Sequence, residues 1–92
     1  MTRRKLEASE DEIKALYKTI LKCKKIEDCE LLFEDLCTKT EVAAMAQRIK
    51  AAEMLKEGCT YEAIIEDTGI SSATLSRINR CLRYGKGYQK FV

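Results

Sequence analysis

Hydrophobic positions recur every three to four residues along almost the whole chain, which is the period of an α-helix. In the first predicted helix they follow the spacing i, i+3, i+4, i+7, i+8 and form one stripe. Its members are Ile13, Leu16, Tyr17, Ile20 and Leu21. Acidic residues at 10–12 precede this stripe and lysines between 22 and 25 follow it, which suits the helix dipole.

Two further helices are predicted before residue 58. The second is indicated by an apolar stripe that consists of Ile26, Cys29, Leu32, Phe33 and Leu36. The third runs from about Lys39 to Glu57, because Thr38-Lys39-Thr40-Glu41 fits the capping-box pattern ahead of a long apolar run. Positions 42–46 of this helix are all apolar, so its apolar surface covers more than one face. Such a helix is normally enclosed by several partners, which hints at a partner subunit.

The segment 60–82 has the pattern of a helix-turn-helix motif. Thr60 can cap a short helix, Gly69 ends it with the positive φ that a tight exit needs, and Ser71 can cap a second helix to about Leu82. Five apolar residues are expected to fix the angle between the two helices: Ile64, Ile65, Ile70, Leu75 and Ile78. In such a motif the second helix projects into the DNA major groove while the first crosses the backbone.

Composition supports an all-α fold in a single domain. The chain has 92 residues, enough for one core, and its four glycines and absent proline leave too few turn residues for a sandwich or barrel. Gly58 is a plausible C-cap residue for the third helix. Residues 84–92 follow the last predicted helix as a short basic and aromatic tail.

Charge is distributed unevenly along the chain. Residues 1–67 carry 12 Lys or Arg and 15 Asp or Glu, hence −3, whereas residues 68–92 carry 5 Lys or Arg and no carboxylate, hence +5. A carboxylate-free basic segment that coincides with a helix-turn-helix pattern predicts a surface that binds nucleic acid. A solvated basic tail is the alternative interpretation of the charge alone.

The outward face of the second motif helix supplies the candidate DNA-binding residues. These are Ser71, Ser72, Ala73, Thr74, Ser76, Arg77, Arg80 and Arg83. Small residues near the helix start permit close approach to base edges, and the free N–H groups after Ser71 suit a phosphate. Arg80 and Arg83 suit phosphate contacts, whereas Asn79 and Arg77 could contact bases or serve packing or a ligand.

The residue types exclude several chemistries. Histidine is absent, so a Ser-His or Cys-His nucleophile cannot be built, and no glycine-rich phosphate loop precedes a predicted helix. The cysteines are odd in number and none are spaced as C-x-x-C, which disfavours disulfides and zinc. They are Cys23, Cys29, Cys37, Cys59 and Cys81. We expect no enzyme, no metal and no required cofactor, and interpret the cysteines as small, reduced, partly buried hydrophobic residues.

The chain is expected to be cytoplasmic and to have no membrane partner. No apolar run approaches the roughly 20 residues of a membrane-spanning helix. The first twelve residues, MTRRKLEASEDE, are highly charged and contain no apolar stretch of the signal-peptide type.

A resemblance to the Trp-repressor-related proteins of the YerC/YecD type is carried by the segment from Ala44 to Gly85, AMAQRIKAAEMLKEGCTYEAIIEDTGISSATLSRINRCLRYG. These proteins have an Ala-Met-Ala-Gln-Arg helix, then Gly-x-Thr-Tyr, then Thr-Gly-x-Ser-x-Ala-Thr-[Ile/Leu]-Ser-Arg-x-Asn-Arg-Cys-Leu. With the preceding helices, the resemblance covers nearly the whole chain. One departure is Ile65, where the group carries alanine at the tight crossing, and this larger side chain should push the two helices slightly apart.

The resemblance implies a Trp-repressor-like domain of five to six helices over residues 1–92, and an intertwined homodimer. Residues 1–57 would be the dimerisation helices, 60–82 the helix-turn-helix and 84–92 the tail. It also implies a role in transcription, with repression as the expected mode and the helix 71–82 reading double-stranded DNA. Two recognition helices about one turn of DNA apart would read a palindrome.

The resemblance also raises the question of a small effector. The Trp repressor holds tryptophan between two arginines, and Arg48 and Arg77 fall in similar places. Cys81 stands where the repressor has a serine of its ligand site, and the spacing from Arg48 to the motif is one residue shorter. An intersubunit salt bridge for Arg48 and a phosphate contact for Arg77 are the alternative roles. Tryptophan or another small effector is therefore a secondary expectation beside DNA binding.

One other function stays open at the level of the sequence, a dimeric helical interaction module whose basic face binds RNA or a protein partner. RNA-binding modules favour exposed aromatic residues for base stacking. Only Tyr84, Tyr88 and Phe91 could form such a platform, and we expect them to pack the tail onto the body or to fray with it.

Overall fold

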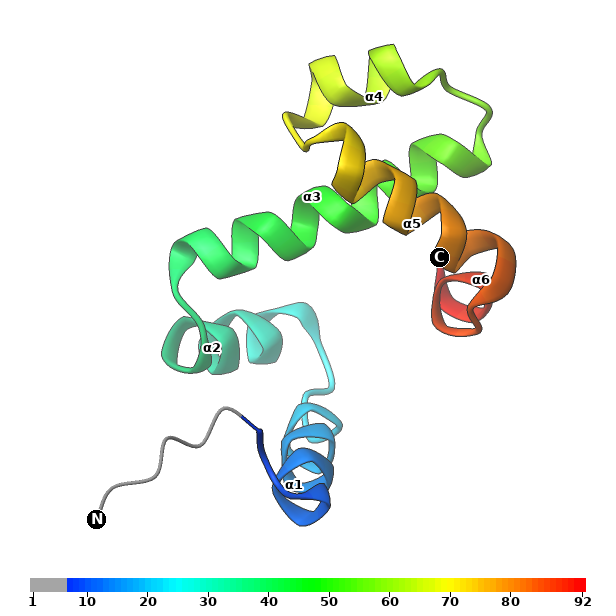
Figure 1. Cartoon of the computed structure of the whole chain (residues 1–92). Coiled ribbons are helices and arrows are strands. Elements are labelled where there is room, and N and C mark those ends of the chain that lie inside the picture. Colours follow the sequence, from blue (N-terminus) through cyan, green and yellow to red (C-terminus); the bar gives the residue numbers. More distant parts are fainter. Residues whose placement is uncertain (1–6) are drawn as a thin grey trace, which may run out of the picture. The chain divides into compact units, whose positions relative to one another are not determined.

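The computed structural model describes residues 7–92 as helices joined by short connections (Figure 1). The elements are α1 (Glu10–Ile20), α2 (Ile26–Leu36), α3 (Lys39–Lys56), α4 (Tyr61–Thr68), α5 (Ser72–Tyr84) and α6 (Gly87–Phe91). This described part of the chain contains no strand. The prediction of an all-α fold of five to six helices is therefore confirmed.

The chain divides into two compact units. One extends to Thr38 and contains α1 and α2, and the other is Lys39–Val92 and contains the remaining helices. No residue of α1 or α2 is buried, whereas α3, α4 and α5 each bury two residues. The described core therefore lies in the second unit. That residues 1–92 form a single domain stays a prediction.

The first helix starts at a complete capping box. The Ser9 side chain accepts a hydrogen bond from the Glu12 N–H at 3.1 Å, and the Glu12 carboxylate accepts from the Ser9 N–H at 2.7 Å. These two bonds satisfy N–H groups that a helix start otherwise leaves unpaired. The predicted acidic start is confirmed, but the helix ends at Ile20, so the lysines between 22 and 25 lie beyond it.

The connection into α2 is held by one side chain. Lys25 is the N-cap residue and makes no side-chain cap, while the Asp28 carboxylate accepts a hydrogen bond from the Lys24 N–H at 3.0 Å. Large apolar side chains remain uncovered here: Leu21 is 80% exposed and Ile26 is 75% exposed. The apolar stripes predicted for α1 and α2 exist, but among the described residues they form no buried core.

The end of α3 has the hydrogen-bond pattern of a Schellman motif. The Cys59 N–H donates to the Met54 carbonyl at 3.0 Å and the Gly58 N–H to the Leu55 carbonyl at 3.1 Å. Gly58 has φ +89°, a conformation that side-chain-bearing residues rarely adopt. The predicted role of Gly58 as a C-cap glycine is confirmed.

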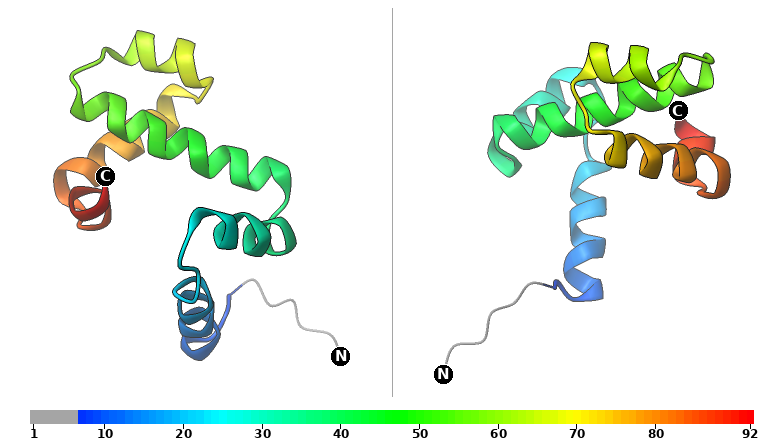
Figure 2. Two further views of the ribbon diagram at one scale, coloured as in Figure 1. Left: turned by 180° about the vertical axis from the view of Figure 1, so that it is seen from behind. Right: turned by 45° about the horizontal axis from the view of Figure 1, so that its top comes forward.

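The core is small and is shared by α3, α4, α5 and the turn between the last two. Its buried residues are Ala51, Ala52, Ile64, Ile70, Leu75 and Ile78. Figures 1 and 2 show α4 and α5 against the C-terminal half of α3, where two consecutive alanines leave room for close approach. Ile64 is fully buried and Ile65 lies at the core's edge, half-buried. The predicted apolar contacts of the motif are thus present.

The C-terminal segment is ordered as α6 rather than as a simple tail. α5 continues to Tyr84, two residues beyond the predicted end, and α6 turns back so that Tyr88 and Val92 pack against the core. Tyr84 and Phe91 stay exposed. The Gln89 side-chain amide donates to the Leu82 carbonyl at 2.9 Å and to the Arg83 carbonyl at 2.8 Å. These bonds satisfy carbonyl groups that a helix end otherwise leaves unpaired.

The cysteines are all free thiols. Four are half-buried as expected, and Cys29 is exposed, contrary to that expectation. The pKa of the Cys23 thiol is raised by desolvation, and further by its hydrogen bond with Cys29. Within residues 7–92, no three acidic or cysteine side chains converge as metal ligands, and no helix is both long and apolar enough for a membrane span.

Candidate nucleic-acid interface

The helix-turn-helix begins at Thr60, whose hydroxyl accepts a hydrogen bond from the Ala63 N–H at 3.2 Å. Gly69 ends α4 with φ +77°, and its N–H donates to the Ile65 carbonyl at 2.8 Å. Because the left-handed conformation reverses the chain within one residue, α5 can start three residues later. The predicted roles of Thr60 and Gly69 are confirmed.

The turn itself is fixed by a buried hydroxyl. Thr68 is only 7% exposed; its hydroxyl donates to the Ile64 carbonyl at 2.7 Å and accepts from the Ile70 N–H at 3.4 Å. A buried hydroxyl that both donates and accepts pays no desolvation penalty for a missing partner. Thr68 lies four residues after Ile64 and so on the same face of the helix, but helical spacing alone does not identify this bridge.

Ser71 is the N-cap residue of α5. Its hydroxyl oxygen accepts a hydrogen bond from the Thr74 N–H at 3.1 Å and its O–H donates to the Thr74 hydroxyl at 3.0 Å. Thr74 is half-buried, so its side chain serves the cap rather than the outer face. The cap leaves the N–H groups of the first turn of α5 directed out of the helix start.

Most of the predicted contact residues lie on one exposed surface of α5. The exposed members are Ser71, Ser72, Ala73, Ser76, Arg77, Arg80 and Arg83. The opposite side of the helix carries Leu75 and Ile78, which are buried. Since the same packing that buries these two residues turns the arginines outward, the core determines which face is offered to a partner. Asn79 lies between the two faces and is half-buried.

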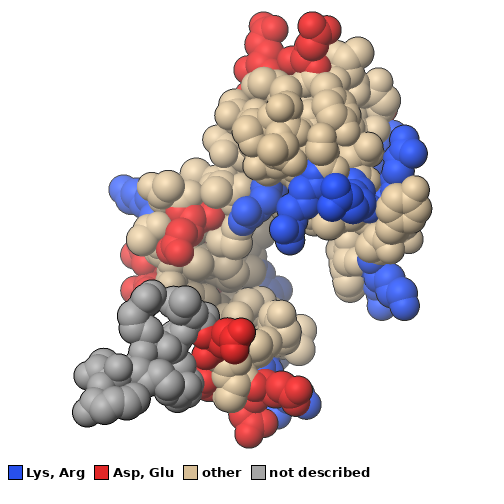
Figure 3. All heavy atoms as spheres, viewed as in Figure 1, with Lys and Arg blue, Asp and Glu red and all other residues tan. Residues whose placement is uncertain are grey.

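The charges of the motif are separated by helix. α4 carries Glu62, Glu66 and Asp67, whereas α5 carries three arginines and no carboxylate. Figure 3 shows acidic side chains at the top of the view, over α4, and basic side chains gathered below them. A basic face on the second helix favours contact with a polyanion along α5.

One ion pair ties α4 to α3. Lys50 Nζ lies 2.9 Å from Asp67 Oδ2, and both side chains are about half exposed. The Asp67 carboxylate raises the pKa of Lys50, first through this hydrogen bond and then through its charge. The arginines of α5 make no ion pair with any described residue, so no acidic side chain of residues 7–92 neutralises them.

The two arginines considered for an effector lie on different helices of the same unit. Arg48 is on α3 and Arg77 on α5, both are exposed, and neither pairs with an acid among residues 7–92. Cys81 is half-buried on α5. Their role in holding tryptophan stays a prediction.

The sequence model of the Trp repressor protein family matches residues 11–92. The chain is 49% identical to YerC of Bacillus subtilis (strain 168) over 74 residues, which make up 80% of this chain and 71% of YerC. The resemblance stated from the motif at residues 44–85 is thereby confirmed.

Two solved structures share the fold, each with a TM-score of 0.82. A TrpR-like protein from Eubacterium eligens ATCC 27750 is 42% identical, and the match covers 87% of this chain and 84% of that chain. A candidate Trp repressor from Staphylococcus aureus is 36% identical, with 89% and 83% covered. The similarity extends over most of each chain.

Proposed function

Because the chain belongs to the Trp repressor family, a family of DNA-binding regulators, we propose that it is a sequence-specific regulator of transcription that binds DNA as a homodimer. The observation that carries the proposal is the capped helix α5, whose exposed face holds three arginines and no carboxylate. The family does not favour the alternative of an RNA- or protein-binding module.

In this proposal α5 enters the major groove with its N-terminal turn foremost. Ser72, Ala73 and Ser76 are small and exposed, so the backbone of α5 can come close to base edges that their hydroxyl and methyl groups contact. Arg80 and Arg83 lie further along the same helix and bind phosphates, which fixes the register of α5 on the duplex. Arg77, one turn from Ala73, is the residue best placed for a base contact.

The homodimer is supported by apolar faces that the described residues leave exposed. Exposed large apolar residues of the first unit include Ile13, Leu16, Tyr17, Leu21, Ile26, Leu31 and Leu36. On α3, Val42 and Ile49 are exposed as well. Apolar surface on this scale marks an association site, and a second copy in the intertwined arrangement is the partner we propose.

Several further features belong to the same proposal. Repression would follow from occupancy of a promoter by the dimer, and the protein would act in the cytoplasm without catalysing a reaction. Tryptophan or another small effector, held by Arg48 and Arg77, is an optional addition to this scheme because the proposed DNA contacts of α5 do not include it.

The proposal is tested by selection of bound sequences from a random duplex library at about 0.15 M salt, with and without tryptophan. At this ionic strength sequence-independent contacts are weakened, so enrichment reports base recognition. We expect an enriched palindrome whose half-sites lie about one helical turn apart. Enrichment only with tryptophan would support the role of Arg48 and Arg77, and a library that stays random in both arms would contradict the proposal.

A further inference from the structure

A pocket lies in the second unit, away from the arginine pair considered for tryptophan. It has a volume of about 390 Å³, which falls within the roughly 300–1,000 Å³ of small-molecule sites. Its lining residues come from α3, α5 and α6: Leu55, Lys56, Asn79, Leu82, Arg83 and Gln89. Neither Arg48 nor Arg77 is among them.

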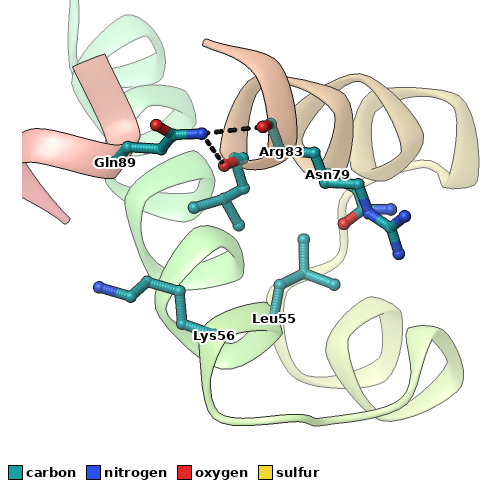
Figure 4. A pocket seen from close by; sticks show the side chains of 6 residues that line it. Leu55, Lys56, Asn79, Arg83 and Gln89 are labelled. Atoms are coloured by element: carbon teal, nitrogen blue, oxygen red, sulfur yellow. Dashed lines mark hydrogen bonds between the residues drawn. The ribbon is translucent and has the colours of Figure 1, made fainter. Parts of the chain in front are cut away.

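The pocket combines an apolar floor with polar walls (Figure 4). Leu55 and Leu82 are half-buried, pack against the core and line the pocket. The Arg83 and Asn79 side chains lie together on one side of it, and Lys56 lies on the other. A small molecule bound here would pack its apolar part on Leu55 and Leu82 and place its polar end beside Arg83.

The Arg83 guanidinium and the Asn79 amide have no partner among the described residues. The half-buried Asn79 amide makes no hydrogen bond with any described residue, and the Arg83 guanidinium makes no ion pair with one. Lys56 Nζ already donates to the Val92 main-chain oxygen at 2.7 Å. No carboxylate lines the pocket. A guanidinium and an amide without partners, in a pocket free of negative charge, match a carboxylate, which accepts two parallel N–H bonds from arginine.

Gln89 holds the α6 wall in place. Its side-chain amide nitrogen donates hydrogen bonds to the carbonyls of Leu82 and Arg83. Gln89 therefore fixes α6 on the end of α5, and this nitrogen is not a free donor for a ligand. The wall is therefore preformed, and a ligand need not order it at an entropic cost.

From this arrangement we propose that the pocket binds a small organic carboxylate with an apolar body. The carboxylate accepts hydrogen bonds from Arg83 and Asn79, and the body packs on Leu55 and Leu82. Lys56 adds positive charge to the opposite rim and favours anions in general.

Ligand binding in the pocket is also coupled to DNA binding, a step that rests on the proposed function. Arg83 is a phosphate contact in that function, and it cannot grip a ligand carboxylate and a DNA phosphate in the same geometry. A bound carboxylate therefore weakens DNA binding, and by thermodynamic linkage DNA weakens ligand binding by the same factor. The ligand acts as an inducer of release, opposite in sign to a corepressor.

The first test measures ligand binding without DNA. The full chain, labelled with ¹⁵N, is titrated with isovalerate, phenylacetate and indole-3-acetate, each compared with its own amide. We expect saturable shifts of the Asn79 side-chain amide signal for at least one acid, with binding about tenfold weaker for its amide, the loss expected for one charge-assisted contact of about 1.4 kcal/mol. Absence of saturation with every acid, or equal binding of acid and amide, would overturn the pocket assignment.

A matched pair of variants locates the contact. Arg83→Gln should weaken acid binding about tenfold, whereas Arg80→Gln, on the same helix and exposed but outside the pocket, should leave it unchanged. Equal losses in the two variants would mean that the acid responds to the overall charge of α5, and the pocket assignment would be wrong.

The second test adds DNA and separates the two proposals. With a duplex from the selection, the bound acid should lower DNA affinity in the wild-type chain and in Arg80→Gln but not in Arg83→Gln. Saturable acid binding together with unchanged DNA affinity would overturn the coupling and leave the pocket standing. A chain that binds the acid and no duplex at all would overturn the DNA-binding function, again without affecting the pocket.

Discussion

At the scale of single residues, Arg80 is the clearest candidate for a contact that adds affinity without sequence information. It is exposed on α5 and has no acidic partner among the described residues. We expect Arg80→Ala to weaken binding to unrelated duplexes by similar factors. The slope of log K against log salt concentration should fall by about 0.9, because one phosphate contact is lost. Anisotropy titrations at several salt concentrations measure both quantities. A loss confined to one duplex sequence would show instead that Arg80 reads a base.

Ser76 should behave in the opposite way. It is exposed on the first half of α5, where a small hydroxyl can contact a base edge. We expect Ser76→Ala to change the ranking of single-base variants of the selected duplex by about 1–3 kcal/mol at one position, while affinity for unrelated duplexes stays nearly constant. Competition titrations against a panel of such variants provide the measurement. Uniform weakening over the whole panel would contradict this role.

The exposed face of α5 could be predicted from the sequence because helical spacing alone assigns its side chains to a face. The same spacing assigns Thr74 to the outward face, but the structure gives it a different role. Its position near the start of α5 brings its hydroxyl to Ser71, so it serves the cap and is half-buried. Arg83 and Asn79 are similar cases, since their shared pocket exists only because α6 folds back beside them.

At the scale of elements, the turn between α4 and α5 depends on the backbone of Gly69. Its φ is +77° and a Cβ added there would meet no atom within 4 Å, so the cost of a side chain is conformational rather than steric crowding by neighbours. We expect Gly69→Ala to lower the free energy of unfolding by about 1 kcal/mol. Denaturant titration measures this change.

Gly87 provides the matched control for that substitution. It also has open space around its Cα, but its φ is outside the left-handed region, and it begins α6. Gly87→Ala should therefore be neutral or stabilise the protein by up to about 1 kcal/mol. Equal destabilisation by both substitutions would argue that the turn does not need a left-handed residue.

The longer helices could be predicted closely because their apolar stripes and caps are local features of the sequence. The predicted third helix, 39–57, differs from α3 by one residue, and Thr60, Gly69 and Ser71 have the predicted roles. The helix α6 could not be found in this way. It has five residues and is held by tertiary contacts of Tyr88, Gln89 and Val92, which no local pattern encodes.

At the scale of the whole molecule, the buried residues among 7–92 all lie in Lys39–Val92, while most of the apolar stripe residues of α1 and α2 are exposed. A chain with this distribution gains stability when a second copy covers the exposed stripes. In the sequence, the apolar surface on several sides of the third helix already favours a partner subunit. It could not specify the partner, because a single chain's pattern does not distinguish internal from intermolecular burial.

We expect Ile26→Gln to shift the protein from dimer toward monomer in sedimentation equilibrium. Ile26 lies on the predicted stripe of α2 and is 75% exposed, so its loss removes apolar area from the contact and not from the described core. Glu27→Gln introduces the same side chain at the next position and should leave self-association unchanged. A wild-type chain that sediments as a monomer at all concentrations would contradict the dimer.

We propose that this chain recognises a specific DNA sequence through α5. The decisive measurement is the ratio of affinities for the selected palindrome and for a scrambled duplex of equal length, at about 0.15 M salt. Sequence-specific regulators bind their sites roughly 10³-fold or more tighter than unrelated DNA, and we expect a ratio of that order. Replacing one half-site should remove most of the gain. A ratio within tenfold of one, with both half-sites intact, would contradict the account.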